Sequence, residues 1–74
     1  MSACAENSTP LIQAIKLLSD DIAVSYRWSH NLGHAAGHAG FENAEAKLHE
    51  AQATLADVRS LIDEALEDIE THAE

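Results

Sequence analysis

An unbroken seven-residue repeat of apolar side chains fills the second half of the chain and constrains the fold more than any other feature. One heptad position, row a, holds large apolar residues: Phe41, Leu48, Leu55, Ile62 and Ile69. The other, row d, holds mostly smaller ones: Ala44, Ala51, Val58, Ala65 and His72. Because no proline or glycine interrupts residues 41–74, the repeat predicts one long amphipathic helix over residues 41–73.

The first half of the chain repeats the pattern and predicts a helix over residues 10–32. Row a continues here with Ile15, Ile22 and Ser29, and row d with Leu11, Leu18, Ser25 and Leu32. Thr9-Pro10 suits a helix start, because threonine can cap free N–H groups and proline lacks a donor that the first turn leaves unpaired. Residues 1–9 show no periodicity, so they are predicted to form a flexible arm ahead of a single domain, residues 10–74.

The glycines place the turn between these helices. All three lie in the eight residues from Gly33 to Gly40, so the chain is expected to reverse over residues 33–40. Gly40 can adopt a left-handed conformation before Phe41. Whether the first helix stops near His30 or continues to Gly37 stays open. Since a parallel zipper normally has leucine in row d, the alanines of the second helix favour an antiparallel hairpin in which rows a and d meet.

One hairpin leaves too much apolar surface uncovered. The first helix is apolar on nearly every side, which is typical of a buried helix, and a core of this size rarely supplies more than about 3–5 kcal/mol. The predicted fold class is therefore all-α, an antiparallel helical hairpin that forms a dimeric four-helix bundle. Six residues are predicted to form the oligomer interface: Ala14, Leu17, Val24, Trp28, Leu61 and Leu66.

Charge and composition exclude several classes of function. Thirteen acidic residues against four lysines and arginines give a net charge of −9, which argues against direct binding of nucleic acid. A single cysteine excludes an internal disulfide framework. No run of 18 apolar residues and no basic signal-like segment is present, so neither a membrane span nor a signal peptide is expected. The expected compartment is the cytoplasm.

The histidines form the one pattern that resembles a metal site. His30, His34 and His38 recur every four residues, and imidazoles so spaced on a helix can reach one Zn²⁺ or Ni²⁺. His49 and Glu45 should lie at a similar level on the second helix. However, the seam geometry turns these side chains away from each other within one hairpin, so solvated or turn-packing histidines without a cofactor are the favoured interpretation.

The second helix ends in a cluster of acids. Five of them are candidates for a partner-binding acidic face: Asp63, Glu64, Glu67, Asp68 and Glu70. Acids near a helix C-terminus oppose the helix dipole, so a solvated face is the simple interpretation and the docking of a basic protein the sharper one.

No catalytic arrangement is evident, because no serine or cysteine has a credible base and no phosphate-binding loop occurs. The favoured function is a small acidic, non-catalytic protein-interaction or regulatory module that acts as a homo-oligomer. The alternatives are a Zn²⁺ or Ni²⁺ site built from the histidines, and an acidic, antitoxin-like inhibitor that masks a basic nucleic-acid-binding surface.

Overall fold

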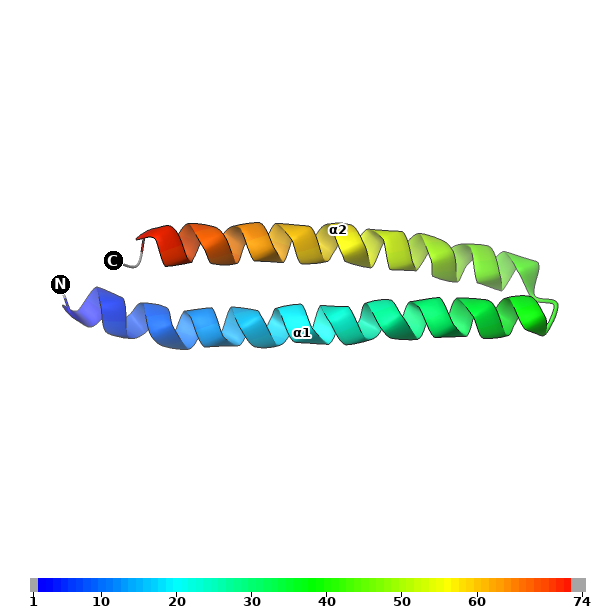
Figure 1. Cartoon of the computed structure of the whole chain (residues 1–74), viewed down its shortest axis with the longest axis horizontal. Helices are drawn as coiled ribbons and strands as arrows, with labels where there is room; N and C mark the ends of the chain where they lie inside the picture. The colour runs from blue at the N-terminus through cyan, green and yellow to red at the C-terminus, as the bar shows by residue number, and fades with distance from the viewer. Residues whose placement is uncertain (1, 73–74) are drawn as a thin grey trace.

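The protein is a two-helix hairpin, which confirms the predicted all-α class. The computed structural model describes residues 2–72, and the side chains of residues 9–72. Helix α1 (Ser2–His38) and helix α2 (Glu42–His72) run antiparallel along their whole shared length (Figure 1). Together they form a rod of 59 × 15 × 10 Å.

Both ends of α1 differ from the sequence prediction. The helix begins at Ser2 and contains Pro10, so the arm predicted for residues 1–9 and the start at Pro10 were wrong for residues 2–9. The φ angle of proline is compatible with a helix, but inside one it removes a hydrogen bond and its ring crowds the carbonyl four residues earlier, at a cost of about 3 kcal/mol. Helix α1 nevertheless continues through Pro10. Met1 and residue 73, the predicted end of the second helix, lie outside the described residues.

At its other end α1 continues to His38, six residues beyond the predicted end at residue 32. It passes through two glycines because both lie toward α2: Gly33 is buried and Gly37 is half-buried. Each glycine costs a helix about 1 kcal/mol relative to alanine, and close packing of α2 against them offsets this cost. The turn is correspondingly shorter than residues 33–40.

The reversal itself uses a glycine cap. Gly40 has φ +87°, in the left-handed region as the sequence predicted. The N–H of Gly40 donates to the carbonyl of Gly37 (3.1 Å), and the N–H of Phe41 donates to the carbonyl of Ala36 (2.9 Å). These two bonds are the pair found in a Schellman motif, and they satisfy carbonyls that the helix end leaves free.

The contacts between the helices fix their register. The Ser19 hydroxyl donates to Asp63 Oδ1 (3.2 Å), and the Gln52 amide lies 3.2 Å from His30 Nδ1. In both pairs the residue numbers add to 82. A methyl group placed on Gly33 would lie 3.5 Å from Leu48 Cβ, which extends nearly the same register toward the turn.

The seam between the helices is rotated from the predicted one. Row a faces it, since Ile15, Ile22, Leu55 and Ile62 are all half-buried. The second row in the seam is not row d but the neighbouring heptad position, row e. In α1 row e comprises Ile12, Ser19, Tyr26 and Gly33, and in α2 it comprises Glu45, Gln52, Arg59 and Leu66.

Row d, by contrast, is almost entirely exposed, so the prediction that it meets its counterpart in the seam was wrong for a single hairpin. Its residues in α1 and all of those in α2 except Val58, which is half-buried, are exposed. Ser19 and Gly33 are small, and with them in row e the helices approach along that row instead. Among the described residues no hydrophobic side chain is buried, and Ser19 is the one buried polar residue.

Candidate interaction surface

One side of the hairpin is apolar. Viewed from one end, the chain winds clockwise in one helix of an antiparallel pair and anticlockwise in the other, so row d lies on the same side of the seam in both helices. Leu61 directly precedes Ile62 of row a in the sequence. Round the circumference of α2 its heptad position neighbours row d, on the side away from row e. We call row d of both helices together with Leu61 the apolar face.

The leucines of the apolar face are open to solvent. Leu11, Leu18 and Leu32 are 47–50% exposed, and Leu61 is 65% exposed. They extend along about half of the 59 Å rod, since Leu11 and Leu32 are about 30 Å apart at 1.5 Å per residue. Contiguous exposed apolar surface is typical of interaction sites, which makes this face the candidate surface.

The six residues predicted to form the oligomer interface do not lie on one surface of the hairpin. Ala14, Leu17, Val24 and Trp28 are all exposed on α1. Ala14 and Trp28 occupy the heptad position beside row d that Leu61 occupies on α2, so they flank the apolar face. Leu66 is half-buried in row e of the seam, so the structure assigns it to contact within the hairpin. Leu17 and Val24 lie farther round α1, on the surface that points away from α2.

The opposite side of the hairpin is polar. It carries the Ser19–Asp63 and His30–Gln52 contacts that bridge the helices. The sequence analysis missed Ser19 and Gln52. The sequence signal for this side is row e of α1. In this row Ser19 and Gly33, which lie fourteen residues apart, are small enough to let a second helix approach closely.

Three histidines cluster on the polar side. The ring centroids of His30 and His34 are 4.5 Å apart, and those of His34 and His49 are 6.1 Å apart, both pairs edge to face. His49 Nε2 lies 4.0 Å from Glu45 Oε2. The expectation that these side chains diverge within one hairpin was therefore wrong for His30, His34 and His49.

The convergence has a physical cause. Because α1 stays helical through Gly33, His30 and His34 share a face, and the bare backbone at Gly33 leaves room for the ring of His49, whose Nε2 lies 3.6 Å from a methyl group built there. His38 lies one turn farther along α1 and is exposed. Among the described side chains of residues 9–72, no three His, Cys, Asp or Glu groups are arranged to hold one metal ion. Metal binding by these residues stays a prediction.

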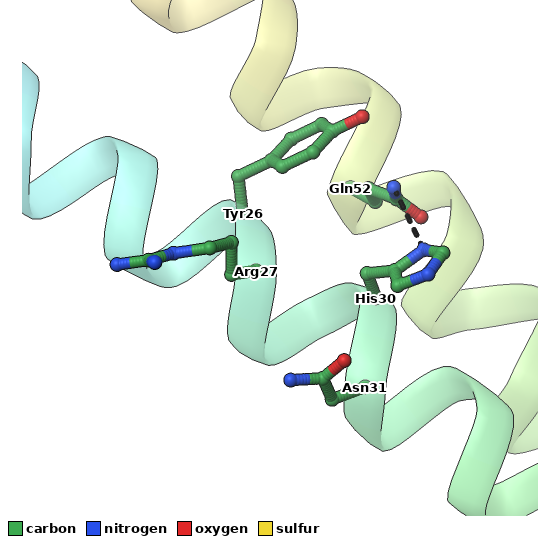
Figure 2. A pocket seen from close by; sticks show the side chains of 5 residues that line it. All are labelled: Tyr26, Arg27, His30, Asn31 and Gln52. Carbon is green, nitrogen blue, oxygen red and sulfur yellow. Dashed lines mark hydrogen bonds between the residues drawn. The ribbon is translucent and has the colours of Figure 1, made fainter.

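A shallow pocket of about 350 Å³ lies beside the histidines, lined by Tyr26, Arg27, His30, Asn31 and Gln52 (Figure 2). Tyr26 and His30 lean toward α2, whereas Arg27 and Asn31 point away from it (Figure 2). The pocket is open to solvent, and its lining contains no carboxylate. It therefore brings together hydrogen-bond donors and acceptors and one guanidinium group.

The acidic candidates are all exposed along the C-terminal half of α2: Asp63, Glu64, Glu67, Asp68 and Glu70. Asp63 accepts the hydrogen bond from Ser19, so it also has a role inside the hairpin. Asp68 lies 3.5 Å from the His72 ring. The others stay available to a partner in solution.

Comparisons with known proteins give no assignment. No family model matches the chain, and no similarity was found to a curated protein or to a solved structure. In the described part of the chain, neither helix has a stretch apolar enough to cross a membrane. Function must therefore be inferred from the surface itself.

Proposed function

We propose that this protein is a non-catalytic interaction module that acts as a homodimer, in which two hairpins pack their apolar faces together into a four-helix bundle. The observation that carries the proposal is the division of one heptad pattern. Row a, apart from Phe41, is half-buried in the seam, while row d, which continues the same repeat, is exposed apart from Val58. In a four-helix bundle both rows point to the common core.

The lone hairpin lacks the burial that a stable fold needs. None of its described hydrophobic side chains is buried. Complete burial of one leucine contributes about 1.5–3 kcal/mol. The exposed fractions of Leu11, Leu18, Leu32 and Leu61 amount to about two leucine side chains per copy, so a second copy would add about 3–6 kcal/mol from each side. This gain is of the same order as the whole stability of a small domain.

The length of the face suits such a dimer. Its exposed leucines span about 30 Å along the hairpin, so a second copy can cover all of them in one contact. A second copy has a face of the same length and apolar character. We further propose that the dimer works in the cytoplasm as a regulatory module, with the polar side and the acids of α2 left free for a protein partner.

Sedimentation equilibrium of the wild-type protein tests this proposal. The chain has a mass of 8.0 kDa, and we expect twice that mass at micromolar concentration. The melting temperature should rise with protein concentration, because folding and association are then coupled. A folded species of 8.0 kDa with a concentration-independent melting temperature would refute the dimer.

A further inference from the structure

We propose that the two copies in this dimer are related by a twofold axis that runs along the rod. Helix α1 of each copy then packs on α2 of the other, every neighbouring pair of helices is antiparallel, and both turns lie at the same end. This inference rests on the proposed dimer and adds to it the orientation of the copies.

Side-chain size along the apolar face carries the inference. The seam pairs residue 19 with 63 and residue 30 with 52, so both sums are 82. Row d residues whose numbers add to 83 therefore lie within about 1.5 Å of the same level of the rod. Leu18 is level with Ala65, and Leu32 is level with Ala51. The small residue of row d in α1, Ser25, is level with Val58, the largest aliphatic residue of row d in α2.

An axis along the rod sets each of these residues opposite its level partner in the second copy. A leucine then faces an alanine at two levels, and a serine faces a valine at the level between them. At these three levels a large residue faces a small one, so the layers can interdigitate at nearly constant helix separation, which is how well-packed cores fill space. At the open end of the hairpin Leu11 is level with His72, so the rule covers the three central levels.

The competing arrangement has its twofold axis across the rod. It packs α1 on α1 and α2 on α2, and the turns lie at opposite ends. With the copies fully overlapped, Leu18 faces Leu32 of the second copy along one edge, while Ala51 faces Ala65 along the other. One edge is then overfilled and the other leaves a void, and both faults destabilise a core.

The charged residues are distributed unevenly between the helices and the two ends of the proposed bundle. Helix α1 has three acids and two bases, whereas α2 has nine acids and two bases. Each acidic α2 has an α1 on either side, and the second α2 lies across the diagonal. The histidine clusters of both copies gather at the turn end, and the acid-rich halves of both α2 helices gather at the other end.

Distance measurement between labels at the turn tests the orientation. In a Cys4→Ser background, Ala39→Cys places one spin label on the exposed turn of each copy, and pulsed dipolar spectroscopy gives the distance between the two. Helix axes in a bundle are 8–10 Å apart, so the proposal predicts a label separation of about 20–30 Å. The competing arrangement predicts a separation near the 59 Å length of the rod.

Ser60→Cys in the same background is the matched control. Ser60 is exposed and lies near the middle of the rod, so its labels should be close in either orientation. A short distance at both positions supports the proposal, and a short distance at Ser60 with a long one at Ala39 overturns it. Absence of dipolar coupling at both positions, with circular dichroism still helical, removes the dimer itself and with it the proposed function.

Discussion

Replacing Leu61 by alanine should weaken the dimer while leaving the hairpin folded. Leu61 is 65% exposed in the single chain, so its truncation removes little that stabilises α2 against α1. In the proposed dimer the same side chain is covered by the second copy. The variant therefore separates association from folding better than a substitution in row a, where Ile62 is half-buried against the other helix.

The magnitude follows from the exposed fraction. If association buries the exposed 65% of Leu61, each copy loses about 1–2 kcal/mol of the 1.5–3 kcal/mol that full burial of a leucine contributes. A symmetric dimer loses this twice, about 2–4 kcal/mol in total. Since 1.4 kcal/mol is a factor of ten, the dissociation constant should rise by about 30- to 1,000-fold.

Leu17→Ala is the matched control for this experiment. Leu17 is 67% exposed, almost the same as Leu61, but it lies on the surface of α1 that points away from α2. Its truncation should change the dissociation constant by less than about threefold. Sedimentation equilibrium across a concentration series measures both constants, and circular dichroism checks that both variants stay helical.

The pair of variants also distinguishes two interfaces. If Leu17→Ala weakens association as strongly as Leu61→Ala, the interface is the outer stripe of α1 that the sequence suggested, and the assignment to row d is wrong. If neither variant changes the dissociation constant, the apolar face is not an interface between copies.

Four further predictions concern Gly33 in α1, Gly40 in the turn, the acids and the histidines. Gly33→Ala should raise the free energy of unfolding in urea by about 0.5–1 kcal/mol, because a methyl group there meets its neighbours at ordinary contact distance and helix propensity improves. Gly40→Ala should lower it by about 1–2 kcal/mol, because φ is +87°. Replacing both Glu67 and Glu70 by lysine should stabilise the fold at low salt, by about 0.3–1 kcal/mol for each substitution. Thermal unfolding at 0.01 M and 0.1 M salt measures this effect. The melting temperature of the wild type should rise with salt, and that of the variant should rise less. Stoichiometric Zn²⁺ or Ni²⁺ should leave the melting temperature almost unchanged, and a large rise that His34→Ala abolishes would show a metal site.

The existence and order of the two helices could be predicted because the patterns that specify them are local. A seven-residue repeat over residues 41–72 and a glycine-rich break before it are readable without tertiary contacts. The ends of α1 could not be read in the same way. Pro10 is a local signal for a helix start, but α1 already begins at Ser2. Gly33 is a local signal for a helix end, but α1 continues through it because Gly33 packs closely against α2. The pattern of a single sequence does not report such packing.

The histidine cluster was missed for a related reason. Whether His34 and His49 converge depends on which heptad row faces the seam, and a rotation of one row on each helix moves both rings toward the same side. Sequence spacing places each histidine on its own helix correctly. It does not give the relative rotation of two helices, which the small side chains of row e decide.

The same rotation explains why the seven-residue repeat correctly predicted the helices but incorrectly predicted that rows a and d meet in the seam. A helix in a four-helix bundle has two neighbours at about a right angle, and its core rows point between them. In such a helix rows a and d both face the core. Row e lies on the edge of this apolar stripe that contacts one neighbouring helix, and row d lies on the edge that contacts the other. The hairpin has rows a and e against the partner helix, and the leucines of row d are exposed, where the proposed bundle would place a second neighbour. If a single hairpin were the final assembly, rotating Leu18 and Leu32 into the seam would bury more apolar surface than Ser19 and Gly33 do. The small residues of row e and the exposed leucines of row d are therefore best explained together, as two parts of one bundle core.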